Sequence, residues 1–126
     1  MSRKWTHDKP DANASEIIAF LRIHGIEVVR TDRPVDILIR RDDGVCGFAE
    51  IKTLARNATI YRSQIEFFVN SDIPSCIVKT PGEALIFAET MQGFSDSEKR
   101  KMDGWLVRNP TVKSLHPAAF EAVLKG

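Results

Sequence analysis

Two carboxylates and a lysine stand at a spacing that suits metal-assisted hydrolysis of a phosphate ester. Asp36 lies in one short apolar run, and Glu50 and Lys52 lie in the next. Hard divalent cations such as Mg²⁺ take carboxylate oxygens, water and substrate phosphate as ligands. A metal ion held in this way polarises a phosphodiester and lowers the pKa of the attacking water. A lysine beside it can orient or deprotonate that water, provided that the fold brings the three side chains together.

A β-hairpin over residues 35–52 would bring them together. Residues 35–40 are rich in branched apolar side chains, as strands are, and Asp42-Asp43-Gly44 is a turn signal. Gly44 accepts the positive φ that closes a three-residue hairpin loop. With this loop, Asp36 faces Glu50 across the strand pair. A two-residue loop would instead place the two carboxylates on opposite faces.

The three-residue loop is preferred because it separates apolar from charged side chains. Side chains alternate between the faces of a strand. One face then carries a set that suits a core, namely Val35, Ile37, Ile39, Ala49 and Ile51. The other face carries the two carboxylates, Lys52, Leu38, Arg40 and Phe48. Two carboxylates directly opposite each other repel at a cost of up to roughly 1 kcal/mol, and a divalent cation between them removes that cost.

Asp36, followed by Glu50-Ile51-Lys52, resembles the signature of the PD-(D/E)xK nuclease superfamily. Pro34-Val35-Asp36 departs from the literal Pro-Asp pair, a variation that the superfamily often shows. A helix before the hairpin and a helix containing Gln64 after it add to the likeness. Within the superfamily, residues 14–88 are most similar to VRR-NUC (virus-type replication-repair nuclease) domains and to the related Holliday-junction resolvases.

The resemblance implies a Mg²⁺- or Mn²⁺-dependent deoxyribonuclease with a restriction-endonuclease-like core. By that likeness, Asp36 and Glu50 are metal ligands, and the backbone carbonyl of Ile51 is a further ligand. Lys52 is the catalytic lysine, and Gln64 is a supporting catalytic residue. The implied substrate is DNA, with branched DNA such as a four-way junction included.

Glu16 and Gln64 each have a second interpretation. A glutamate on the first helix completes the acidic site in many superfamily members, yet Asn13 and Glu16 also have the spacing of a capping box. Gln64 falls on an apolar helical stripe with Tyr61, Ile65 and Phe68, where a glutamine needs a polar partner. That partner is either the metal site or the backbone and water.

Basic residues gather around the proposed site, although the net charge of the chain is only +1. A local basic patch binds phosphate without a high overall charge, and such binding weakens as salt rises. The alternative is that these arginines solvate strand and loop surfaces. The residues expected to contact DNA are Arg33, Arg40, Arg56 and Arg62.

The whole pattern predicts an α/β fold with a mixed sheet of about four or five strands flanked by helices. Further strands are expected over residues 27–30 and 75–79, the latter as a buried central strand. Asp103-Gly104 is read as a turn before an edge strand or interface at residues 105–107. The expected helices cover residues 14–24, 61–69, 81–91 and 117–125, with a short basic helix through residues 99–101.

The chain is expected to form one domain in the cytoplasm. Residues 1–12 are predicted to be a polar N-terminal arm, and residues 13–126 a single nuclease-like domain. Residues 92–126 of that domain form a helical extension. The sequence contains no apolar run long enough to span a membrane and no signal peptide. Cys46 and Cys76 belong to no CxxC pair, which indicates reduced thiols.

Three functional interpretations follow. The first is the nuclease, for which the likeness to resolvases implies a homodimer, because a four-way junction needs two symmetric cuts. Its interface is expected at an exposed Trp105 region or at the terminal helix. The second is a non-catalytic DNA-binding subunit of a repair or restriction assembly with the same fold. The third is an interaction protein with surface charges on its hairpin, in which Asp36→Ala would cost little stability.

Overall fold

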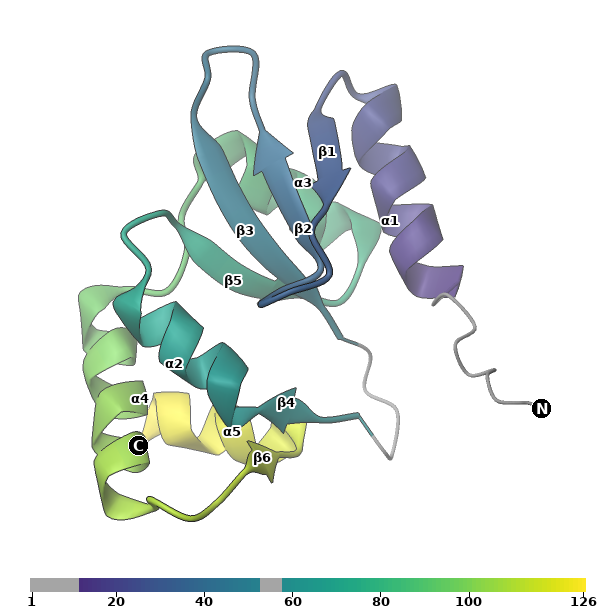
Figure 1. The fold of residues 1–126 in the computed structure, drawn as a ribbon. Coiled ribbons are helices and arrows are strands. Elements are labelled where there is room, and N and C mark those ends of the chain that lie inside the picture. The colour runs from purple at the N-terminus through teal and green to yellow at the C-terminus, as the bar shows by residue number, and fades with distance from the viewer. Residues whose placement is uncertain (1–11, 53–57) are drawn as a thin grey trace, which may run out of the picture.

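A mixed sheet forms the frame of the molecule. The computed structural model describes residues 12–52 and 58–126, and within them four strands pair in the order β1-β2-β3-β5 (Figure 1). Strands β1, β2 and β3 are antiparallel, whereas β3 and β5 run parallel. A separate two-stranded sheet pairs β4 with β6. The strands are β1 (Glu27–Arg30), β2 (Ile37–Arg40), β3 (Cys46–Ile51), β4 (Ile60–Tyr61), β5 (Ser75–Val78) and β6 (Ser114–Leu115).

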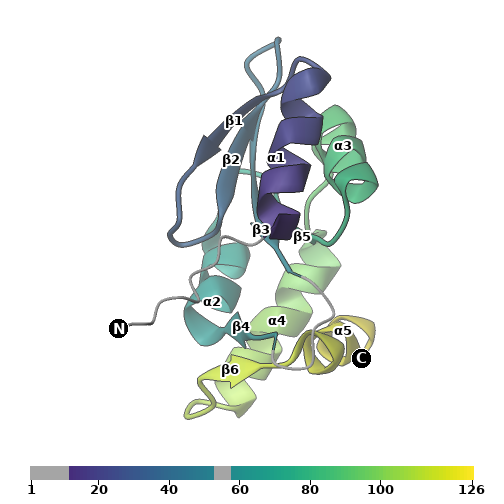
Figure 2. The ribbon, with the colours of Figure 1, turned by 90° about the vertical axis from the view of Figure 1, so that its right-hand side faces the viewer.

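Five helices in the described part of the chain pack around this sheet. α1 and α3 lie together on one face, and α2, α4 and α5 gather against the other face at one end of the sheet (Figure 2). The predicted mixed α/β class is confirmed. None of the described helices combines the length and apolar character that a membrane crossing requires. The helices are α1 (Ala12–Ile23), α2 (Arg62–Asn70), α3 (Pro81–Thr90), α4 (Asp96–Arg108) and α5 (Pro117–Lys125).

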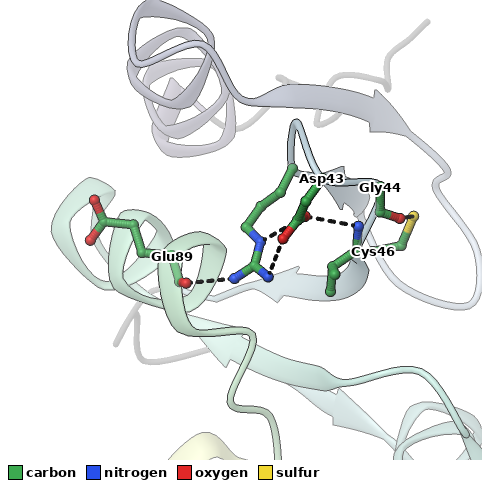
Figure 3. Close-up of polar contacts among 6 residues, drawn as sticks. Asp43, Gly44, Cys46 and Glu89 are labelled. Carbon is green, nitrogen blue, oxygen red and sulfur yellow. Dashed lines mark hydrogen bonds and ion pairs between the residues drawn. The ribbon is translucent and has the colours of Figure 1, made fainter.

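The β2–β3 hairpin has the predicted register. Ile37 pairs with Ala49, and the Arg41 N–H donates to the Val45 carbonyl at 2.9 Å, which leaves a three-residue loop. Gly44 has a φ of 87°, a conformation that glycine adopts without strain. The loop is held by the Arg41 guanidinium, which bonds to the Asp43 carboxylate at 2.9 and 3.2 Å, and to the Glu89 carbonyl on α3 (Figure 3).

Two apolar clusters hold the layers together. The first joins α1 and α3 to one sheet face, where Ile37, Ile39, Ala49 and Ile51 are buried as predicted. The second joins α2, α4 and α5 around Phe68, with Phe48 packing against it from the sheet. Edge-to-face ring contacts such as Phe48 with Phe67, at 5.2 Å between centroids, order this cluster. Asp36, Glu50 and Lys52, which share the sheet face of Phe48, therefore project toward the α2 side.

Two predictions for the sheet are wrong in detail. Val35 is buried, but in the second cluster, because β2 begins only at Ile37 and the strand alternation does not extend back to it. β5 is an edge strand of the four-stranded sheet and not a central one. Helices cover β5, which explains why its sequence is apolar enough to resemble a central strand.

The predicted turn at Asp103-Gly104 and strand at residues 105–107 are also wrong, because α4 continues through them to Arg108. Met102 and Trp105 pack into the second cluster, and that burial outweighs the roughly 1 kcal/mol by which glycine disfavours a helix interior. Trp105 is only 7% exposed, which contradicts its expected exposure. A capping box of Ser95 and Glu98 begins α4, with hydrogen bonds of 2.9 and 3.1 Å.

The start of the chain differs from the prediction as well. α1 begins at Ala12, so Asn13 lies inside the helix and is not its cap. The Asn13 amide instead donates to the Lys79 carbonyl at 3.3 Å, which ties the first turn of α1 to the end of β5. Residues 1–11 of the predicted N-terminal arm, and the predicted DNA contact Arg56, lie outside the described residues.

Candidate active site

Asp36 and Glu50 stand opposite each other where β2 begins and β3 ends. The pairing of Ile37 with Ala49 continues to these two residues. The Phe48 N–H points away from β2 and donates to the Pro74 carbonyl at 2.9 Å. Phe48, and Glu50 two residues later, therefore occupy positions without a backbone hydrogen bond to β2. At such positions of an antiparallel pair the Cα atoms are only about 4.5 Å apart and side chains are closest. The predicted juxtaposition of the two carboxylates is therefore present.

Each carboxylate accepts a backbone N–H from the other strand. The Ile51 N–H donates to Asp36 Oδ2 at 2.8 Å, and the Asp36 N–H donates to Glu50 Oε1 at 3.1 Å. Asp36 takes the place of a backbone acceptor here, because the Val35 carbonyl accepts the Thr31 hydroxyl at 2.6 Å. These bonds fix both side chains at the strand ends.

Lys52 completes the group from the same face of β3. Its Nζ lies 3.1 Å from Glu50 Oε2, as expected for residues two apart on one strand. The Lys52 N–H bonds to the Val78 carbonyl at 3.0 Å, which extends the parallel pairing of β3 with β5 by one residue and holds the lysine in place. The ammonium also lies 5.9 Å from the centroid of the Tyr61 ring.

Gln64 approaches the group from the first turn of α2. Its Oε1 accepts the Tyr61 N–H at 3.0 Å, and its Nε2 donates to the Pro34 carbonyl at 3.4 Å. Hydrogen bonding from the Gln64 side chain also lowers the pKa of the Glu50 carboxyl. The interpretation in which Gln64 bonds to the backbone is confirmed, and its part in a metal site stays a prediction. The four predicted catalytic residues come together.

Burial and charge act strongly on Glu50, which is 3% exposed. Desolvation, as the main cause, and then the Asp36 charge raise the pKa of its carboxyl from the ordinary 4.5, and the net value is about 7. The Lys52 ammonium and hydrogen bonding from Lys52 and Gln64 act in the opposite direction. A bound cation would favour the ionised form of this buried carboxylate beside Asp36.

The donor set fits a hard divalent cation. A carboxylate offers about four lone-pair sites, so the backbone donors described above do not by themselves exhaust Asp36 and Glu50. The Ile51 carbonyl, the third predicted ligand, belongs to the residue directly after Glu50 at the end of β3. Mg²⁺ commonly uses one or two carboxylates and completes its shell with water and substrate phosphate.

Glu16 does not join this group. Among the residues that the structure describes, no group of three or more aspartate, glutamate, histidine or cysteine side chains could hold a metal ion together. Glu16 is therefore not a third acidic residue beside Asp36 and Glu50. Glu16 is exposed on α1, which packs on the sheet face opposite to α2. Glu16 is thus a solvent-exposed glutamate, as the second interpretation has it, but it forms no capping box with Asn13.

The arginines predicted to contact DNA are spread over different surroundings. Arg33 is exposed and borders a cavity beside Gln64. Arg40 lies at the far end of β2, about 13 Å along the strand from Asp36, and pairs with Glu27 at 3.6 Å. Of the three predicted DNA contacts that the structure describes, Arg33, Arg40 and Arg62, only Arg33 is both exposed and close to the carboxylate pair.

Arg62 has a structural environment that its sequence position did not reveal. Its guanidinium donates to the carbonyls of Leu106, Asn109 and Val112 at 2.6 to 3.2 Å. It also packs 5.7 Å from the centroid of the Trp105 ring. These contacts tie α2 to the end of α4, so the structure gives Arg62 a structural role, and its contact with DNA stays a prediction.

Replacing Arg62 by alanine is expected to destabilise the protein by about 2–3 kcal/mol, because three partly buried carbonyls lose a charged donor. Thermal unfolding of the purified variant would measure this loss. Arg40→Ala is the matched control and should change stability by less than about 1 kcal/mol, since its ion pair is exposed. An Arg62→Ala protein as stable as the control would contradict this structural role.

The chain was compared with models of protein families, with curated proteins and with solved structures. None of them matches it. The likeness to PD-(D/E)xK nucleases therefore rests on the residues of the hairpin and of α2, and the argument for a function rests on their geometry.

Sequence reasoning missed one feature of the site. Tyr61 was expected on the buried stripe of α2, but it precedes the helix in an extended conformation and is 55% exposed. The sequence does not tell whether an aromatic residue at the start of an apolar stripe lies inside the helix, in the core, or caps the helix, exposed to solvent. Tyr61 lines a cavity together with residues 32–34, and local sequence does not reveal such a neighbour.

Proposed function

We propose that this chain is a metal-dependent deoxyribonuclease of the PD-(D/E)xK type with a restriction-endonuclease-like core. The observation that carries the proposal is the facing pair of Asp36 and Glu50, with Lys52 Nζ 3.1 Å from Glu50 at the same strand end. The hairpin precedes a helix and a parallel strand, an order in keeping with that core. Mg²⁺ or Mn²⁺ is the proposed cofactor.

The chain's own residues would divide the work as follows. Asp36 and Glu50, with the Ile51 carbonyl, would hold the cation, which supplies polarisation of the scissile phosphate and a more acidic attacking water. Lys52 would orient or deprotonate that water, or offset charge on a phosphate oxygen, through its Nζ. Gln64 would hold Glu50 in position through its bonds to the two backbone segments beside it. Fixed charges, and not a covalent intermediate, would supply the catalysis.

The rival interpretation is a DNA-binding subunit of the same fold that does not cut. Its support is that Lys52 already neutralises Glu50, so the pair also makes sense as a structural ion pair. The two interpretations differ in what a metal ion does. In the nuclease, the ion is needed for product formation, whereas a non-catalytic subunit binds DNA equally well with chelator.

Cleavage of end-labelled DNA tests the proposal directly. Wild-type protein would be incubated with duplex, flap and four-way-junction DNA in Mg²⁺, in Mn²⁺ and in EDTA. We expect metal-dependent cutting that Lys52→Ala lowers by about a hundredfold or more, the usual size of a lost acid–base group. Arg100→Ala, an exposed change on α4, is the control and should cut like wild type. Intact substrates under every metal condition would contradict the proposal, and junction binding without cutting would favour the rival.

A homodimer is part of the proposal where the substrate is a four-way junction, because the two cuts are symmetric. Burial of Trp105 leaves the terminal helix α5 as the remaining expected interface. Sedimentation equilibrium of the wild-type protein would give the oligomeric state, and a monomer bound to junction DNA would remove this part of the proposal.

A further inference from the structure

A cavity of about 670 Å³ opens beside the carboxylate pair, between residues 32–34 and the start of α2. Its volume falls within the range of about 300–1,000 Å³ that is usual for small-ligand sites. Gln64 forms part of its wall and also borders Glu50, so the cavity adjoins the proposed reaction centre. The lining residues are Asp32, Arg33, Pro34, Tyr61, Ser63 and Gln64.

Tyr61 gives the cavity an aromatic wall. The side chain is 55% exposed, although a tyrosine at the start of a helix could pack inward, and its ring lies 5.9 Å from the Lys52 ammonium. Exposed aromatic rings next to cationic groups are the surfaces on which unpaired bases stack in single-strand-binding proteins. The ring is therefore placed to receive a flat group within reach of the lysine.

The polar groups of the wall match a nucleotide better than a bare phosphate. Arg33 and Ser63 offer donors to a phosphate, and Arg33 makes no ion pair with another described residue. Asp32 would repel an isolated anion, but a carboxylate accepts hydrogen bonds from the amino group of a base. An aromatic face, an arginine, a hydroxyl and a carboxylate together suit a base and its phosphate.

We infer that this cavity binds one unpaired nucleotide of a DNA strand, with its base on the Tyr61 ring and its phosphate at Arg33. A base inside a continuous duplex cannot enter such a site without leaving its stack, which costs a few kcal/mol. The inference rests on the proposed function and deepens it. The substrate class would be DNA with an unpaired nucleotide next to the scissile bond, such as a flap, a branch or a single-stranded end.

Binding measured in EDTA, where no cutting occurs, tests the inference separately from catalysis. Fluorescence anisotropy would compare a labelled single-stranded oligonucleotide with a blunt duplex of the same length. We expect wild type to prefer the single strand, and Tyr61→Ala to weaken that binding about 5- to 100-fold, the usual range for one lost stacking contact. Tyr61→Phe keeps the ring and should bind within about twofold of wild type. Arg33→Gln should lower the salt dependence by about one phosphate contact.

Each outcome assigns the failure to one of the two ideas. Equal binding by Tyr61→Ala and wild type, or no preference for the single strand, would overturn the nucleotide site even if the protein cuts duplex DNA with Mg²⁺. Loss of single-strand binding in Tyr61→Ala, with Tyr61→Phe intact, would support the nucleotide site even if no metal condition gives cleavage. Thermal melts followed by circular dichroism would show that both Tyr61 variants keep the fold.

Discussion

Asp36→Asn is expected to lower metal-dependent DNA cleavage by about a thousandfold, because losing a charged ligand removes several kcal/mol of transition-state stabilisation. Asparagine keeps an oxygen that can accept the Ile51 N–H, so the fold of the hairpin should survive. Initial rates on the preferred labelled DNA, at saturating Mn²⁺, would measure the effect.

The control for this variant is Asp42→Asn, which removes a charge from the exposed tip of the same hairpin. It should cut within about threefold of wild type, as surface changes away from a site usually have small effects. Cleavage by Asp36→Asn at the control rate would exclude Asp36 as a metal ligand. Melting temperatures of both variants in EDTA would confirm that each is folded at the assay temperature.

Glu50→Gln is expected to stabilise the metal-free protein at pH 8 but not at pH 4.5. The pKa of Glu50 is raised from 4.5 to about 7, so the folded state holds a proton over a range in which the unfolded state has released it. The stability contributed by protonated Glu50 is complete below about pH 4.5 and is lost as the pH rises through about 7. Above that pH, wild type should be less stable than the variant by up to roughly 3 kcal/mol.

Thermal melts of both proteins between pH 4 and pH 9 in EDTA would test this difference. Adding Mg²⁺ at pH 8 should raise the melting temperature of wild type and leave that of Glu50→Gln unchanged, since only a carboxylate pair attracts the ion. A constant difference at every pH would show that Glu50 is stably ionised in the fold. It would then be better described as the partner of Lys52 in a structural ion pair.

The hairpin could be predicted because its determinants are local. The turn signal Asp42-Asp43-Gly44 and strict alternation on both sides select one register, and that register alone places Asp36 opposite Glu50. Lys52 then follows from the two-residue period of a strand. The chemistry most tied to function was thus encoded within eighteen consecutive residues, 35–52.

Other features depend on partners far along the chain and could not be predicted. Gly104 and Trp105 appear as a turn and a strand until the second apolar cluster is assembled around them. Arg62 appears available for DNA until residues 106–112 fold back to present their carbonyls to it. Tyr61 likewise lines a cavity with Asp32, Arg33 and Pro34, which lie almost thirty residues before it. Local patterns report periodicity, whereas these environments are set by tertiary contacts.

The central claim is that Asp36 and Glu50 form a site for a divalent cation. The most direct measurement is Mn²⁺ binding at pH 8, followed by the loss of the free-ion signal in electron paramagnetic resonance. Wild type and Asp42→Asn should each bind Mn²⁺ at one ion per chain, and Asp36→Asn should bind none at the same concentrations. Absence of binding by wild type, or equal binding by Asp36→Asn, would contradict the claim and leave the carboxylate pair a structural feature of the hairpin.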